Sequence, residues 1–393
     1  MSGLREYRDE LYPPNTEEVN ERNVKLFFKF ITERHMIWKR RFIDQLPREQ
    51  WTKNKILRVT KYTNTYRQLD RGSLWCFHQI LRPNWIWTDK TPEDFKRLLW
   101  KVVIYRLCVR IETFEQIGLP ARDNFDPFTY LKRFYNIILA DNQPTCTNAF
   151  LTLGGLFKGV SRPTGLVYAM MYLDNNMEGL CNRIQNADTG YKLMNVLCEL
   201  PGVSGFMAYE IYCDLCYCKD AIKFTINDAV NTGPGCVEGL RLLFPVTDCK
   251  RSNTLPTLLI LLDEQDMYFD DLKIKFPYMN WLEPVKNQLS LRTIEHSLCE
   301  FSKYWLQYMS LKNKTKYGKR RLEYDRWSTH NNCTVGKYGK ILRYDKKAYQ
   351  EFERMSRYVM EPSKGYTRFK KNKEIDKEMY YNFIIDLQRR VIG

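Results

Sequence analysis

The sequence of 393 residues contains no uninterrupted apolar run long enough to form a transmembrane helix. Its first residues, MSGLREYRDELYPP, are charged and polar, so we expect no secretory leader. A protein without a leader is expected in the cytoplasm, where thiols stay reduced. We therefore expect the 12 cysteines to form no disulfides. These absences predict a cytoplasmic protein without a membrane partner.

Signatures of nucleotide and metal sites are also missing. The glycine-rich residues 154–165 match neither the Walker pattern nor a dinucleotide-binding GxGxxG after a strand. Cys213, Cys216 and Cys218 are closely spaced, but no second CxxC and no HxxxH completes a tetrahedral ligand set. We expect these cysteines to be small buried side chains, and we expect no metal or organic cofactor.

Positive charge, by contrast, is abundant. The chain has 62 lysines and arginines against 46 aspartates and glutamates, which gives a net charge of +16. An excess of this size favours a polyanionic partner such as nucleic acid, and a merely soluble basic surface is the alternative. Hydrophobic residues make up 44% of the chain and aromatic residues 14%, which is typical of a well-packed globular protein.

Hydrophobic periodicity predicts a mainly α fold. We expect a polar arm at residues 1–20, a helical domain carrying the catalytic residues at 21–310, and a basic, aromatic-rich extension at 311–393. In the extension, Lys319, Arg320 and Arg321 follow Tyr317. Basic residues interleaved with aromatic ones suit a nucleic-acid backbone with stacked bases, and a solvated tail is the alternative.

Residues 188–218 predict two amphipathic helices joined by Leu-Pro-Gly-Val-Ser-Gly. Gly202 and Gly205 allow a tight bend, and together with Ser204 they open the second helix, where bare amides can bind a DNA phosphate. An ordinary helical turn with a glycine cap is the alternative. The pattern resembles the helix-hairpin-helix of the DNA base-excision glycosylase superfamily. In that superfamily an aspartate follows the hairpin, and here Asp228 lies 26 residues after Gly202.

Residues 51–73 predict a further helix, with Asn64, Arg67 and Asp70 three residues apart along one side. These residues form either a polar surface stripe or, because Tyr66 lies beside them, a partly buried set whose polar groups need partners. A cleft that holds a base and a phosphate would supply such partners.

Residues 91–118 predict a long central helix. Thr91 is a suitable N-cap, and Asp94 is its capping-box partner. The apolar residues of this helix lie nearly all round it, so Arg106 should be paired.

Several blocks of the sequence, in order, resemble one known family. The blocks are FFKFITERHMIWKRR, WTKNKIL, YTNTYRQLD, YRLCVRIETFEQIG, LPGVSGFMAYEIYCDL, GPGCVEGL and IEHSLCEFSKY. They are similar to the pattern of the α-glutamyl/putrescinyl-thymine pyrophosphorylase family, whose relatives include the helical domain of phage 5-hydroxymethyluracil DNA kinases. The similarity covers roughly residues 21 to 325. It departs from the pattern where Asn54 replaces Asp, Cys108-Val109 replaces Phe-Asn, and Ser204 replaces Gly.

The resemblance implies an enzyme of viral DNA modification. Members of the family are thought to replace the phosphate or pyrophosphate of activated 5-hydroxymethyluracil with an amino acid or polyamine, which gives hypermodified thymidine. The sequence contains no P-loop, so the resemblance implies transfer and not phosphorylation. The implied partners are double-stranded DNA with a modified pyrimidine and a small nucleophile, in the cytoplasm of a host cell.

The resemblance also gives the candidate residues expected roles. The substrate-binding residues would be Asn64, Tyr66, Arg67, Asp70 and Arg106. Asn64 would read the edge of the everted pyrimidine, and Arg67, with Arg106, would hold the leaving phosphate. Asp228 would take the proton of the incoming nucleophile or stabilise positive charge at the methylene carbon.

Two other functions stay open at this point. In a DNA glycosylase, Asp228 would stabilise the sugar oxocarbenium ion or activate a water molecule. A DNA-binding module would use the hairpin without any catalysis.

Overall fold

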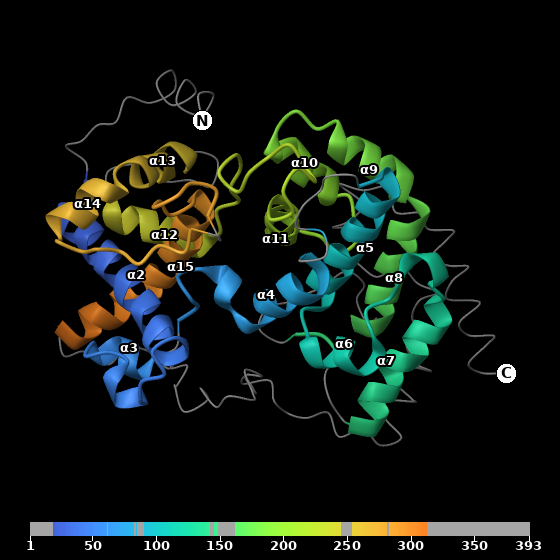
Figure 1. The fold of residues 1–393 in the computed structure, drawn as a ribbon, viewed down its shortest axis with the longest axis horizontal. Helices are drawn as coiled ribbons and strands as arrows, with labels where there is room; N and C mark the ends of the chain where they lie inside the picture. Colours follow the sequence, from blue (N-terminus) through green and yellow to red (C-terminus); the bar gives the residue numbers. More distant parts are fainter. Residues whose placement is uncertain are drawn as a thin grey trace. The chain divides into compact units, whose positions relative to one another are not determined.

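The computed structural model describes residues 19–60, 62–81, 84, 90–141, 145–147, 162–244, 254–280 and 283–312. Every secondary-structure element among them is a helix, so the mainly α fold is confirmed (Figure 1). None of these helices is both long enough and apolar enough to cross a membrane. Most of the expected N-terminal arm lies outside the described residues, as do Lys319, Arg320 and Arg321.

The chain divides into two compact units, which we describe separately. Unit 1 comprises Met1–Leu74 and Phe224–Asn332, and unit 2 comprises Trp75–Lys223 and Cys333–Gly393. The segment expected to be one domain, residues 21–310, therefore contributes to both units. Helix α4 (Arg71–Cys76) contains the boundary.

Unit 1 is built around two long helices. Its helices are α2 (Glu21–Phe42), α3 (Lys55–Val59), α12 (Pro234–Leu243), α13 (Leu255–Asp263), α14 (Gln265–Asp271) and α15 (Leu291–Lys312). Phe27 of α2 meets Phe301 of α15 edge-on, with ring centroids 5.5 Å apart. Phe28, on the next position of α2, packs against Phe269 of α14 at 5.0 Å. These aromatic contacts join the beginning and the end of the described chain in one core.

Helix α12 lies directly on α15 because glycines stand where the two helices meet. A Cβ atom at Gly239 would lie 2.5 Å from the carbonyl oxygen of Leu298, closer than real Cβ atoms approach. A Cβ atom at Gly235 would collide with Sγ of Cys299. The GPGCVEGL block is therefore explained by close helix packing, which only glycine permits here.

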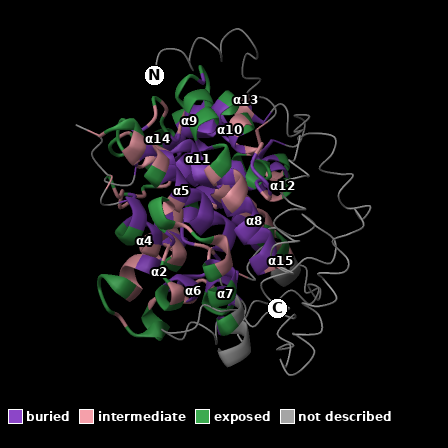
Figure 2. Ribbon diagram, turned by 90° about the vertical axis from the view of Figure 1, so that its right-hand side faces the viewer, coloured by how far each residue is buried: buried purple, intermediate pink, exposed green. Residues whose placement is uncertain are grey.

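Unit 2 is centred on α5. Its helices are α5 (Pro92–Cys108), α6 (Ile111–Ile117), α7 (Pro127–Asp141), α8 (Arg162–Asn175), α9 (Met177–Gln185), α10 (Gly190–Leu197) and α11 (Gly205–Cys216). Nearly every side chain of the last three turns of α5 is buried, and Figure 2 shows buried residues along α5, α8 and α11. The predicted capping box of Thr91 and Asp94 is present at the start of α5.

The single helix predicted for residues 91–118 is wrong, because the chain breaks after Cys108. Val109 adopts the left-handed conformation, with φ 47° and ψ 36°, and Arg110 is extended before α6 begins. The carbonyl at the end of α5 is satisfied outside the helix, since Cys108 accepts a hydrogen bond from Thr147 N at 2.8 Å. The apolar pattern continues across the break and therefore does not reveal it.

Candidate functional site

The helix predicted for residues 51–73 is also wrong, although its polar residues do come together. Helix α3 ends at Val59, and Thr60 is already extended, with φ −117° and ψ 130°. The chain then runs through Asn64 to a 3-10 turn at Arg67–Leu69. β-Branched residues at 59, 60, 63 and 65 favour this extended path over a helix.

A chain of hydrogen bonds holds this segment against α2. Arg34 of α2 donates to the Tyr62 carbonyl from Nε at 3.1 Å and from Nη2 at 2.9 Å, and its Nη2 also donates to Asn64 Oδ1 at 2.8 Å. Asn64 Nδ2 in turn donates to Asp70 Oδ1 at 2.9 Å. Asp70 Oδ2 lies 2.8 Å from Nη1 of Arg67, whose side chain is about a quarter exposed (24%). Both ends of the Asn64 amide are therefore occupied, and Arg67 and Asp70, each about a quarter exposed, are the members of the set that reach solvent.

His296 of α15 contacts the same segment from the other side. Its Nε2 lies 3.0 Å from the Asn64 carbonyl oxygen, and its Nδ1 lies 3.0 Å from the Arg292 carbonyl oxygen. A neutral imidazole has one N–H and can donate to only one of these acceptors. Burial, followed by the charges of Arg67 and Arg292, lowers the pKa of His296 to about 3, so the ring is neutral near pH 7.

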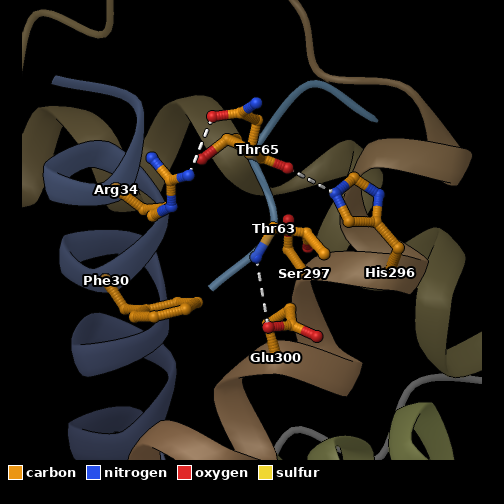
Figure 3. Close-up of a pocket in the computed structure, with 8 residues that line it drawn as sticks. Phe30, Arg34, Thr63, Thr65, His296, Ser297 and Glu300 are labelled. Atoms are coloured by element: carbon orange, nitrogen blue, oxygen red, sulfur yellow. Dashed lines mark hydrogen bonds between the residues drawn. The ribbon is translucent and has the colours of Figure 1, made fainter. Parts of the chain in front are cut away.

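A small pocket opens between α2, the extended segment and α15 (Figure 3). The residues lining it are Phe30, Arg34, Thr63, Asn64, Thr65, His296, Ser297 and Glu300. Glu300 accepts a hydrogen bond from Thr63 N at 3.3 Å and one from Lys303 Nζ at 2.5 Å. The space reaches about 150 Å³ only when open solvent is counted and has no room for a whole water molecule, so it is a narrow gap and not a ligand-sized cavity.

Asp228 also belongs to unit 1 and lies in a loop beside the start of α15. Its Oδ2 accepts hydrogen bonds from Thr225 N at 2.6 Å and Thr225 Oγ1 at 2.9 Å. The neighbouring Asn227 accepts a bond from the amide of Leu291, the first residue of α15, at 2.8 Å. His296 follows five residues later, about 7.5 Å along the helix axis at 1.5 Å per residue. The Asp228 loop and the pocket thus contact the first two turns of one helix.

The predicted hairpin lies in unit 2 as α10, a tight turn and α11. Leu200 to Val203 form a type II turn, in which Val203 N donates to the Leu200 carbonyl at 3.1 Å and Gly202 has the required positive φ of 79°. Ser204 is the N-cap of α11, but its side chain makes no capping hydrogen bond, and both Ser204 and Gly205 are exposed. The helix therefore begins at the surface with backbone amides directed outward, which suits an anion.

Arg106 of unit 2 is paired within the core, as the helix pattern predicted. It donates to both carboxylate oxygens of Asp214 at 2.6 Å and to Glu210 Oε2 at 2.8 Å. All three side chains are at most 6% exposed. Because Glu210 and Asp214 lie on α11, this cluster fixes the second hairpin helix on α5, and we assign Arg106 to positioning and not to phosphate binding.

The structure also describes Tyr66 and the three closely spaced cysteines, which the sequence singled out. Tyr66 is fully buried, and its hydroxyl accepts a hydrogen bond from Met279 N at 3.2 Å. Cys213 and Cys218 are buried while Cys216 is partly exposed, and no disulfide forms among the ten cysteines that the structure describes. Within the same residues, no group of three or more potential ligands is placed to hold a metal ion.

The sequence interpretation missed three residues of the pocket: Arg34, His296 and Glu300. Arg34 and Glu300 lie in two of the sequence blocks quoted above, so a signal existed for both. His296 lies in the same block as Glu300, but a single histidine in a helix is usually structural, so it was not interpreted as part of a site.

Comparison with known proteins identifies a family that matches most of the described residues. The family described as 5-hmdU DNA kinase, helical domain, matches residues 21–312, which include the pocket, the Asp228 loop and the hairpin. The chain belongs to this family. A 5-hmdU DNA kinase of Bacillus phage SP10 is 24% identical over 296 residues, which cover 72% of this chain and 45% of that protein. The chain thus spans less than half the length of this curated relative, and no solved structure matches it.

Proposed function

We propose that this helical-domain protein is a DNA-modifying transferase. It would replace the phosphate or pyrophosphate of activated 5-hydroxymethyluracil in DNA with a small nucleophile such as an amino acid. The observation that carries the proposal is the family match over residues 21–312, supported by the similarity to a phage 5-hmdU DNA kinase. The product, a hypermodified thymidine, would protect viral DNA from nucleases in the cytoplasm of the host.

The reaction needs an everted base, a held strand and a proton acceptor. The target carbon lies outside the ring of a stacked base, so the nucleotide must leave the duplex. The surface amides at Ser204 and Gly205 would bind a DNA phosphate. The nucleophile's nitrogen would form a bond to the methylene carbon while the carbon–oxygen bond breaks, and the phosphate would leave with the electron pair.

Asp228 is the proposed acceptor of the proton that the nitrogen loses. Its Oδ2 is held by Thr225, while its Oδ1 makes no hydrogen bond within the described part of the chain. A fixed carboxylate with one oxygen available is the arrangement that a general base requires. Arg67 would contact the departing phosphate, because its guanidinium is partly exposed and a fork of donors suits phosphate oxygens. Asn64 and Tyr66, which are buried, would support this arrangement and not contact the substrate, while Asp70 would orient Arg67 through their ion pair.

Mass spectrometry of nucleosides tests the reaction. The protein is incubated with DNA containing 5-phosphomethyluracil and a mixture of amino acids and amines, and the DNA is then digested. A heavier nucleoside is the expected result. A released base with alkali-labile strands would show a glycosylase instead, and unchanged DNA that still binds the protein would show a binding module.

Asp228→Asn should abolish product formation, because an amide cannot accept the proton. Its oxygen can still accept the Thr225 bonds, so the loop should be retained. The control is Asp220→Asn, which removes the same charge from an exposed loop residue with a positive φ of 65°, a conformation that asparagine tolerates. Wild-type turnover by Asp228→Asn would remove this residue from the mechanism.

Ser204→Asp tests the hairpin separately. Aspartate is as good an N-cap as serine, so the stability of α11 should be maintained. Its carboxylate would repel a DNA phosphate at the helix start, and affinity for DNA at low salt should fall roughly tenfold or more. The control Asn176→Asp puts the same charge at the N-cap of α9, and there the affinity should change much less.

A further inference from the structure

The end of α2 in unit 1 carries two large apolar side chains that face solvent. Phe42, the last residue of the helix, is 51% exposed, and Ile43 is 59% exposed. The guanidinium carbon of Arg41 lies 4.5 Å from the centre of the Phe42 ring and 5.2 Å from that of Trp51. The ring of Trp38, one turn back on α2, also contacts Phe42, with centroids 6.1 Å apart. The Phe42 ring is therefore held by its neighbours while half of it stays accessible.

Basic residues are concentrated around this ring. Residues 39–58, from the end of α2 to α3, contain seven basic and two acidic residues, which leaves a net charge of +5 in 20 positions, whereas the whole chain reaches +16 in 393. We call the exposed side chains of this segment the α2–α3 surface. Its fully exposed basic residues are Arg48, Lys53, Lys55 and Arg58.

Hydrogen bonds bring the parts of the α2–α3 surface together. Arg40 Nη1 donates to the Trp51 carbonyl at 2.6 Å, and Trp51 Nε1 donates to the Leu46 carbonyl at 2.8 Å. Arg58 of α3 donates to the Thr52 carbonyl at 3.4 Å. The loop after α2 is thus folded back on the end of that helix, with α3 bound to the loop (Figure 1).

Helix stability does not account for all of these charges. The basic residues in the last turn of α2 suit the helix dipole, and one of them, Lys39, is also paired with Asp44 at 2.8 Å. Lys53 and Lys55, however, stand on either side of Asn54, the N-cap of α3, where the dipole disfavours a cation. Exposed cations in an unfavourable position favour a surface that serves an anionic partner.

We propose that the α2–α3 surface binds a stretch of DNA strand with unpaired bases, its phosphates on the basic residues and one base stacked on Phe42. The inference rests on the proposed function, from which it takes DNA as the substrate. Basic residues beside an accessible aromatic ring are the combination that single strands require. A polyanion without bases would use the charges and leave the ring of Phe42 without a role. In an intact duplex the faces of the bases are covered by their neighbours, so the ring could not stack on them.

The α2–α3 surface lies well away from the Asp228 loop within unit 1. Asn227, next to Asp228, binds the amide of Leu291 at the start of α15, whereas Asn54 donates to the hydroxyl of Tyr304, 13 residues further along that helix. The two contacts are therefore about 20 Å apart along the axis at about 1.5 Å per residue. Neighbouring phosphates of a strand are only about 3.4 Å apart along a helix of DNA, so one nucleotide cannot reach both places. The surface would hold a flank of the strand and not the reacting base, and its loss should raise KM for DNA without changing kcat.

Fluorescence anisotropy of the full chain tests the proposal, with unmodified labelled oligo-dT as the single strand and a duplex of the same length. Phe42→Ala should weaken binding to oligo-dT roughly fivefold or more, and binding to the duplex much less, because only the strand can stack on the ring. Phe42→Tyr keeps an aromatic ring and should bind oligo-dT like the wild type. Lys55→Gln should reduce the slope of log affinity against log salt for oligo-dT by about 0.7, the value for one phosphate contact on a single strand.

Two matched controls lie elsewhere in unit 1. Met267→Ala removes a side chain that is 53% exposed on α14, and Lys25→Gln removes a charge near the other end of α2; both should leave oligo-dT binding unchanged. The proposal is overturned if Phe42→Ala binds oligo-dT like the wild type, or if it weakens strand and duplex binding equally.

The nucleoside assay keeps the two proposals apart. Ring-dependent binding of oligo-dT without any modified product would refute the transferase and leave the surface. Product formation with an unchanged KM in Phe42→Ala would refute the surface alone.

Discussion

Val109 offers a sharp test of the break between α5 and α6. A left-handed backbone costs an L-residue about 1–2 kcal/mol, and a β-branched residue is least suited to it. Val109 adopts this conformation with φ 47° while its amide donates to the Tyr105 carbonyl at 2.6 Å. The related family pattern has asparagine here, which tolerates the left-handed region. We therefore expect Val109→Asn to stabilise unit 2.

The size of the effect follows from two opposing terms. Relief of the backbone strain contributes about 1–2 kcal/mol. Val109 is only partly buried, so the lost apolar contact costs at most about 1 kcal/mol, roughly half the value for a fully buried valine. The net expectation is a gain of about 0.5–1 kcal/mol in the free energy of unfolding. Val109→Ala loses the same contacts but keeps a Cβ atom and most of the strain, and should be less stable than the wild type.

Hydrogen exchange of the α5 and α6 amides is the suitable assay, because two compact units need not unfold in one transition. Urea denaturation followed by circular dichroism supports it. The control is Val59→Asn in α3, where the side chain is 56% exposed and the backbone is helical, so no gain is expected. If Val109→Asn protects these amides no better than Val109→Ala does, the strain argument is wrong.

Three other outcomes follow from the same structure. Gly239→Ala should destabilise unit 1 by at least about 1–3 kcal/mol in urea denaturation, because its Cβ would meet the backbone of Leu298. Gly233→Ser at the N-cap of the same helix, where a Cβ meets open space, should not destabilise it. Burial raises the pKa of Glu283 from 4.5 to about 8, so the folded protein holds this proton more tightly than the unfolded chain does. The stability that the neutral carboxyl group contributes is complete below about pH 4.5 and is lost as the pH rises to 8. Glu283→Gln should therefore exceed the wild type in stability by on the order of 4 kcal/mol at pH 8 and by little at pH 5; a constant difference would contradict this. Gly202→Ala should destabilise the hairpin by about 1–2 kcal/mol in thermal unfolding, because position 202 has a φ of 79°. It should also weaken DNA binding, which salt-dependent fluorescence anisotropy measures; unchanged binding would show that the turn is dispensable.

Local signals in the sequence predicted local structure well. The capping box at Thr91 and the turn around Gly202 each depend on residues that are adjacent in the chain, and both are present. The two helices that were predicted too long failed for a common reason. Apolar periodicity reports which side chains are buried, and buried residues stand on both sides of the breaks at Thr60 and Val109 even though the backbone does not remain helical. An asparagine at position 109 would have signalled the second break, but this chain has valine there.

The roles of the polar residues depended on partners far away in the sequence. Asn64, Arg67 and Asp70 do converge, but through a turn and with Arg34, 30 residues from Asn64, as the fourth member. A polar side chain that binds a substrate and one that binds another side chain look the same in a single sequence, because both need a partner when buried. The structure separates them by showing which atoms are already used. Both ends of the Asn64 amide and the whole guanidinium fork of Arg106 are occupied, whereas Asp228 keeps one carboxylate oxygen without a hydrogen bond among the described residues. Chemistry in this chain is therefore to be sought first at Asp228, where Asp228→Asn tests it.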